Sequence, residues 1–150
     1  MSIPALDQKG LLPVGIHVCN WAEVEAAFCW NRHRSNLFNG LQTFIRTEWA
    51  PLSLPADLWI NGSFTRTKDH PDDIDLVADL SQYPNEQAFP GVLLSLRRAE
   101  LKGIYGVDFW VKHPLIPTDL TIFFQYTGLK AGAELGLDSK RLKGILRVAP

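Results

Sequence analysis

Cysteine is scarce in this chain, which has only Cys19 and Cys29 among its 150 residues. The two thiols match no metal-ligand spacing, and they are too few for a disulfide-rich scaffold. No apolar run approaches the length of a membrane span. The first residues lack a basic region followed by an apolar run, so we expect no signal peptide and a cytoplasmic protein with reduced thiols.

An excess of charge of either sign is also missing. Lysine and arginine total 15 and aspartate and glutamate total 16, which gives a formal net charge of -1. Such a balance gives no overall electrostatic attraction to nucleic acid or an anionic membrane, although local basic patches are still possible. The composition, 46% hydrophobic and 21% charged, is that of a globular protein without repeats. The length favours a single domain over residues 1–150.

Helical and strand patterns are mixed along the chain rather than strictly alternating. Residues 1–19 are rich in proline and glycine and predict an extended arm. Apolar spacing and capping residues predict helices at 20–28, 32–49 and 92–103. β-Branched and aromatic runs predict strands at 58–60, 73–80, 105–111, 120–127 and 144–149, with a loop at 81–91. The mixture predicts an α+β fold, with a mixed β-sheet and helices packed mainly on one face.

The stretch "INGSFTRTKDHPDDIDLV", residues 60–77, places two carboxylates two residues apart in a predicted strand. Residues two apart point to the same face, so Asp73 and Asp75 would project side by side, about 7 Å apart along the chain. Carboxylates this close repel each other, and a divalent cation would relieve the repulsion. Carboxylate oxygens are the ligands that Mg²⁺ prefers. The pair therefore predicts a magnesium site, with Ile74 turned into the core.

Gly62 and Ser63 precede this strand and follow another, at a predicted turn. Glycine lets the backbone come close to a ligand, and the backbone N–H groups with the Ser63 hydroxyl could hold a phosphate. The hairpin would then carry a phosphate cradle beside a metal site. The alternative is a surface hairpin with a solvated acidic turn.

This constellation resembles the DNA polymerase beta-like nucleotidyltransferase superfamily. Its signature is an apolar residue, Gly-Gly or Gly-Ser, roughly nine to thirteen residues, and then Asp-apolar-Asp or Asp-apolar-Glu. Here Asn61 stands at the apolar position, and Ile60 lies one residue earlier. Lys68 and Pro71 also look like that superfamily's hairpin. The segments "LPVGIHVCNWAEVEAAFCWNRHRSNLFNGL", "YGVDFWV" and "LKGILRV" resemble a small, poorly characterised bacterial branch of it.

The resemblance implies a metal-dependent nucleotidyltransferase with a nucleotidyltransferase-like fold. Asp73 and Asp75 would hold Mg²⁺ or Mn²⁺ on the triphosphate of an NTP, and Gly62, Ser63 and Lys68 would contact the nucleotide. The nucleoside monophosphate would pass to a hydroxyl acceptor, either on a partner protein, as in minimal nucleotidyltransferase antitoxins of toxin-antitoxin pairs, or on RNA or a small molecule. The alternative is a non-catalytic nucleotide-binding or protein-interaction module with the same fold.

The resemblance also requires a third catalytic, metal-binding carboxylate, and two aspartates are candidates. Asp108 lies inside the apolar strand "GVDFWV", where an unpartnered charge would be costly. Asp119 follows a proline at the start of "LTIFF", where a carboxylate in a turn would simply be solvated. We favour Asp108 and keep Asp119 as the alternative.

Overall fold

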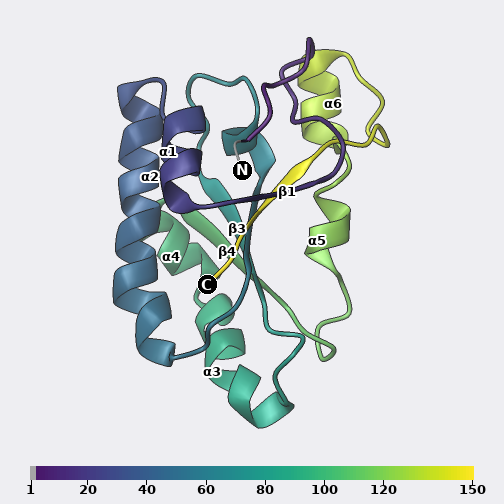
Figure 1. Cartoon of the computed structure of the whole chain (residues 1–150). Helices are drawn as coiled ribbons and strands as arrows, with labels where there is room; N and C mark the ends of the chain where they lie inside the picture. The colour runs from purple at the N-terminus through teal and green to yellow at the C-terminus, as the bar shows by residue number, and fades with distance from the viewer. Residues whose placement is uncertain (1–2) are drawn as a thin grey trace.

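The centre of the protein is one mixed β-sheet of five strands. In chain order they are β1 (Ile16–Cys19), β2 (Leu58–Asn61), β3 (Ile74–Asp79), β4 (Val107–Lys112) and β5 (Ile145–Val148). Their order across the sheet is β1-β5-β2-β3-β4. The β1/β5 and β3/β4 pairs are parallel, and β2 is antiparallel to both β3 and β5. This computed structural model describes residues 3–150 (Figure 1).

Four helices cover one face of the sheet, as Figure 1 shows. They are α1 (Trp21–Phe28), α2 (Arg32–Phe44), α3 (Asn85–Leu96) and α4 (Arg98–Tyr105). Alternate strand residues, such as Ile60, Leu76 and Phe109, point into this layer and form the main apolar core with the helices. The predicted α+β class, with helices mainly on one face, is confirmed.

The opposite face of the sheet has a smaller cover. Trp59, Val77 and Ile145 form a second buried cluster there. Two short helices, α5 (Leu120–Phe123) and α6 (Leu129–Leu135), belong to the segment that lies on this side (Figure 1). Because side chains alternate along a β-strand, residues two positions away from these three on the same strands also point to this face. The sparse cover leaves room for a site at one end of the face.

The first two helices form where the sequence predicts them. The Asn20 side chain accepts a hydrogen bond from Glu23 N, and the Glu23 carboxylate accepts one from Asn20 N, which completes a capping box. Asn31 caps α2, which continues into the π-helical turn Ile45–Trp49. The sequence prediction of helices in both regions is correct.

Three predicted elements differ in the structure. The single helix expected at 92–103 is divided at Arg97 into the end of α3 and the start of α4. The loop expected at 81–91 is helical from Asn85 onward: Pro90 lies inside α3 and removes one intrahelical hydrogen bond, while burial of Ala88 and Leu94 favours the helix. The strand expected at 120–127 is instead α5 followed by turns. Asp119 caps α5, and Leu120 and Phe124, four residues apart, pack on the second cluster. The aromatic and apolar residues that suggested a strand here instead form the packed side of a short helix.

The N-terminal segment has no helix or strand between residue 3 and Gly15, yet Leu11 and Leu12 are buried. Residues Ile16–Cys19 join the sheet as its edge strand β1. None of the helices in residues 3–150 is both long enough and apolar enough to cross a membrane.

Candidate functional site

A row of three polar side chains crosses the sheet where β2 ends and β4 begins. Asn61 is the register partner of Asp75, and Asp75 is the register partner of Asp108. Side chains of paired residues share a face, so all three lie on the sparsely covered side. The next row on that face is Trp59, Val77 and Trp110. The predicted carboxylates Asp75 and Asp108 are thus neighbours on adjacent strands, although 33 positions separate them in the sequence.

Helix α4 supplies a cation to each of two site carboxylates. Asp73, one residue before β3, receives Nζ of Lys102 at 2.9 Å. Asp108 is buried and receives a hydrogen bond from Nε of Arg98. The Arg98 guanidinium also lies 3.8 Å from the ring centroid of Trp110. Both predicted acids are therefore neutralised in pairs at this end of the sheet.

Asp75 is the site carboxylate without such a partner. Within residues 3–150 its carboxylate has neither a hydrogen bond nor an ion pair. Burial, together with the negative charges of Asp73 and Asp108, raises the pKa of Asp75 to about 7. A cation beside Asp75 would lower this pKa, because it would favour the charged carboxylate.

Gly62 lies next to the same carboxylate. It begins the 3₁₀ turn Gly62–Thr65 after β2, with a positive φ of 77°. A Cβ at this position would overlap Oδ2 of Asp75. Glycine is therefore required twice here, for its backbone conformation and for the close approach of Asp75.

Arg34 of α2 fixes the chain that follows Gly62. Its guanidinium is fully buried and donates to the carbonyl oxygens of Phe64 and Arg66 at 2.7 Å and to that of Lys68 at 2.7 and 2.9 Å. It donates more weakly to Ser63 O, at 3.4 Å. The turn predicted as a phosphate cradle is thus held from behind by a single side chain.

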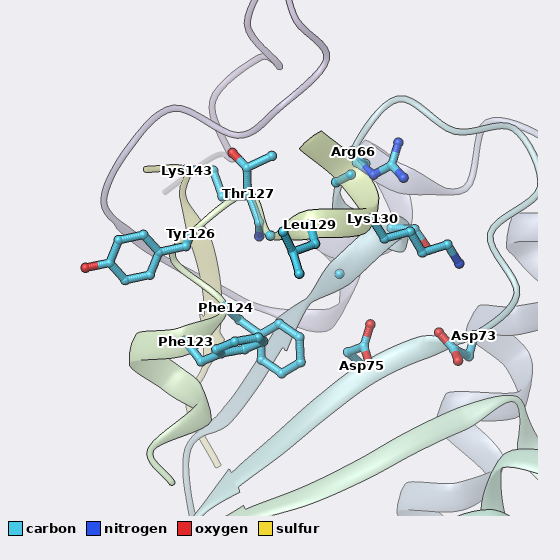
Figure 2. Close-up of a pocket in the computed structure, with 14 residues that line it drawn as sticks. Arg66, Asp73, Asp75, Phe123, Phe124, Tyr126, Thr127, Leu129, Lys130 and Lys143 are labelled. Carbon is cyan, nitrogen blue, oxygen red and sulfur yellow. The ribbon is translucent and has the colours of Figure 1, made fainter. Parts of the chain in front are cut away.

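A cavity of about 350 Å³ opens between this turn and the segment that carries α5 and α6 (Figure 2). Its hairpin side consists of Gly62, Ser63, Asp73 and Asp75. The opposite side carries the aromatic residues Phe123, Phe124 and Tyr126 and the basic residues Lys130 and Lys143, and Arg66 completes the lining. The volume lies in the range of small-molecule sites. The cavity therefore combines acidic, basic and aromatic surfaces.

Lys143 is the most unusual basic group in this lining. Its side chain is buried, and within residues 3–150 its Nζ has no hydrogen-bond partner. Burial lowers the pKa of Lys143 to about 8, against the opposing effect of the Asp75 charge. The amide of Asn61 is also buried, and both its oxygen and its nitrogen lack a partner in the same part of the chain. Buried polar groups are usually hydrogen-bonded, so a water, an ion or a ligand in the cavity could supply the partner for these two.

Three candidates from the sequence, Asp108, Lys68 and Asp119, are not part of the cavity lining. Lys68 is directed to α6, where its Nζ lies 3.5 Å from Oε1 of Glu134, which also binds Arg66. Asp119 caps α5 by accepting hydrogen bonds from Thr121. Partial burial acts to raise the pKa of Asp119, but the bonds from Thr121 and the charge of Lys112 outweigh it and leave that pKa below its ordinary value. The structure therefore brings Asp108, and not Asp119, beside Asp75.

The donor groups at the site fit a divalent cation in part. Asp73 and Asp75 offer carboxylate oxygens beside a cavity, and the raised pKa of Asp75 marks a place where positive charge is missing. Across residues 3–150, however, no three histidine, cysteine, aspartate or glutamate side chains are grouped closely enough to hold a metal. Asp108, the predicted third ligand, has its carboxylate bound by Arg98. A cation could bind Asp75 directly, whereas Asp73 would first have to leave Lys102 and Asp108 would have to leave Arg98.

Several lining residues were not predicted from the sequence. Phe123 and Tyr126 were assigned to a strand, and Lys143 to the turn-rich run before the last strand, where nothing local distinguishes it from a solvated lysine. Arg66 and Lys130 likewise carry no motif. Only the tertiary structure reveals them, because it brings the segment from Phe123 to Lys143 next to the hairpin that carries Arg66.

The chain belongs to a family of unknown function, DUF6932, which it matches over residues 4–149. No curated protein matches it. No solved structure matches it either.

Proposed function

We propose that this DUF6932 protein is a metal-dependent nucleotidyltransferase, which moves a nucleoside monophosphate from an NTP to a hydroxyl acceptor. The observation that carries the proposal is that Gly62, Ser63, Asp73 and Asp75 line one cavity at the end of the sheet, with Asp108 paired to Asp75 on the adjacent strand. The superfamily that the sequence resembles requires this combination. The alignment of Asp108 with Asp75 supports it independently of the motif.

The cavity offers suitable surfaces for each part of a nucleotide. Phe123 and Tyr126 are exposed aromatic rings that could stack on a base, a contact that every base tolerates. Ser63, Arg66 and Lys143 would face the phosphates from the hairpin and from the opposite side. The triphosphate would then extend from the aromatic rings toward Asp73 and Asp75.

Asp73 and Asp75 would hold Mg²⁺ or Mn²⁺, and the cation would supply stabilisation of the negative charge on the reacting phosphate. In the reaction a bond forms between the acceptor oxygen and the α-phosphorus, and the bond from that phosphorus to pyrophosphate breaks. Asp108 would accept the proton of the acceptor hydroxyl once its carboxylate leaves Arg98. Lys102 and Arg98 would hold the carboxylates apart when no nucleotide is bound.

The acceptor is a hydroxyl on a partner protein or on RNA. A second function, a nucleotide-binding or interaction module without catalysis, is favoured by one observation. Asp73 and Asp108 already have cationic partners on α4, and residues 3–150 contain no ready group of three metal ligands. The two functions differ in one measurable property, because only the enzyme transfers label.

The test is transfer of label from each of four α-labelled NTPs, with Mg²⁺ or Mn²⁺, to cell proteins or RNA. We expect Asp73→Ala and Asp75→Ala to abolish transfer, and Asp108→Asn to reduce it by about 10²-fold or more, because a proton acceptor is lost. Asp119→Asn is the matched control and should transfer like the parent.

Transfer that survives in both Asp73→Ala and Asp75→Ala would overturn the proposal. Metal-dependent NTP binding without any transfer would instead establish the non-catalytic module. Loss of transfer in Asp119→Asn but not in Asp108→Asn would move the third carboxylate to Asp119.

A further inference from the structure

An ammonium group without a partner is buried in the lining of the cavity. The Lys143 side chain is 6% exposed, and within residues 3–150 its Nζ makes no hydrogen bond. Burying a charge in this way is unfavourable unless a bound group pairs with it. No backbone or side-chain acceptor within residues 3–150 hydrogen-bonds Nζ. The charge of Asp75 acts on Lys143 without hydrogen-bonding it, so a direct partner for Nζ would be an anion from outside the described residues.

The surroundings of Lys143 fit an oxyanion. Figure 2 shows Lys143, Thr127 and Leu129 on one side of the cavity, with the carboxylates of Asp73 and Asp75 on the other. Ser63 adds a hydroxyl to the lining. Arg66 is buried there too, but its Nη2 is bound to Glu134. Lys143 is thus the buried cation of this lining that forms no salt bridge within residues 3–150, although the charge of Asp75 acts on it.

We infer that Lys143, with Ser63, forms a subsite that binds a phosphate group of a polyphosphate directly, without a metal ion. The inference rests on the proposed function for the identity of the ligand, which would be the NTP. It assigns the binding of one phosphate to a lysine next to β5, outside the Gly-Ser and Asp-Ile-Asp motif. The carboxylates of Asp73 and Asp75 would repel the same group, so the ammonium fixes which side of the cavity the phosphate takes.

The test measures binding of inorganic tripolyphosphate by calorimetry in EDTA, so that no metal ion contributes. The parent should bind, and Lys143→Met should weaken binding by about tenfold or more, as expected for a charge-assisted hydrogen bond. Without ligand, Lys143→Met should melt a few degrees higher, because a buried unpaired charge is replaced by an apolar chain of similar length. Lys130→Met is the matched control: Lys130 lines the same cavity with a 73% exposed side chain, so both effects should be small.

A structural role for Lys143 would give a different pair of results, a lower melting temperature and unchanged affinity for tripolyphosphate, and would overturn the inference. Lys143→Gln provides a second variant of similar length, which should lose affinity in the same way if Lys143→Met does not fold. The proposed function can fail without the subsite. If the parent transfers no label but its binding of tripolyphosphate still depends on Lys143, the transferase proposal is wrong and the subsite is supported. Transfer by the parent, with unchanged tripolyphosphate affinity in Lys143→Met and Lys143→Gln, would remove the subsite alone.

Discussion

At the residue scale, two charged side chains of this site lie in surroundings that disfavour their charged forms. Asp75 lies among other carboxylates, and Lys143 is a buried ammonium with no hydrogen bond within residues 3–150. Two such groups at one cavity lower the stability of the free protein, and only bound ligands would offset this loss. Stability measurements on single variants can therefore report on the site without any knowledge of the acceptor.

Asp75→Asn should stabilise the protein at neutral pH in a buffer with EDTA. The folded-state pKa of Asp75, about 7, lies above the ordinary value of 3.8, so the folded protein binds more protons between these values. Stability from this group is fully present below about pH 4 and is lost as pH rises through 7. The free energy of unfolding of Asp75→Asn, relative to the parent, should therefore increase between about pH 4 and pH 7. Urea unfolding should show it level off at a gain of about 2–4 kcal/mol.

Asp119→Asn is the control for this pH dependence, because the pKa of Asp119 is lowered by its partners. A lowered carboxylate pKa contributes stability above the unfolded-state value, so this variant should be equal to or less stable than the parent at pH 8. A gain for Asp75→Asn that does not change between pH 4 and pH 8 would contradict the electrostatic explanation.

At the scale of elements, the site depends on how α2 and α4 are placed beside the sheet. Arg98 and Lys102 reach the carboxylates from successive turns of α4. Arg34 reaches from α2 to the chain after Gly62, and its guanidinium lies 3.6 Å from the Trp30 ring centroid. The hairpin by itself therefore does not hold the geometry of the cradle.

Arg34→Met should destabilise the protein by about 3–5 kcal/mol, because it leaves buried carbonyl groups of residues 63–68 without donors. The stability of Arg34→Lys should lie between those of the parent and Arg34→Met, because an ammonium has fewer donors than a guanidinium and lacks its planar geometry. The measurement is urea unfolding monitored by tryptophan fluorescence. Arg32→Met, at an exposed position in the first turn of α2, should change stability by less than about 0.5 kcal/mol. Equal effects at positions 32 and 34 would show that the carbonyl contacts are unimportant.

At the scale of the whole molecule, the two faces of the sheet differ in how firmly they are covered. The face with α1 to α4 encloses the main core, while the other carries a cluster of three buried apolar residues under the short helices α5 and α6. Large apolar side chains of this segment remain exposed, among them Ile122, Phe123 and Leu129. The cavity lies under the less firmly packed layer.

Hydrogen exchange should show this difference directly. Backbone amides of α5 and α6 should exchange much faster than those of β3 and β4, because few buried contacts hold the two helices. Adding an NTP with Mg²⁺ should slow exchange at residues 123–131, which line the cavity. Mass spectrometry of deuterium uptake would measure both effects. Equal protection of α5 and β3 in the free protein would contradict the picture of two unequal faces.

The sequence by itself determined the features that depend on near neighbours. The caps of α1 and α2, the strands that flank the Gly62 turn, and the same-face placement of Asp73 and Asp75 all follow from spacing over a few residues. The preference for Asp108 over Asp119 also came from local burial, and the structure places Asp108 beside Asp75. The α+β class follows from the same local patterns.

Only the tertiary structure decided what surrounds these residues. The sequence separates Asp75 from Arg98 and Lys143 by more than 20 positions, so no local pattern could show which carboxylates are paired and which lysine is buried. The aromatic run at 120–127 was read as a strand because its composition suits one, whereas burial of Leu120 and Phe124 on Trp59 favours a helix. Burial and charge pairing are properties of distant segments brought together, and they set the chemistry of this cavity.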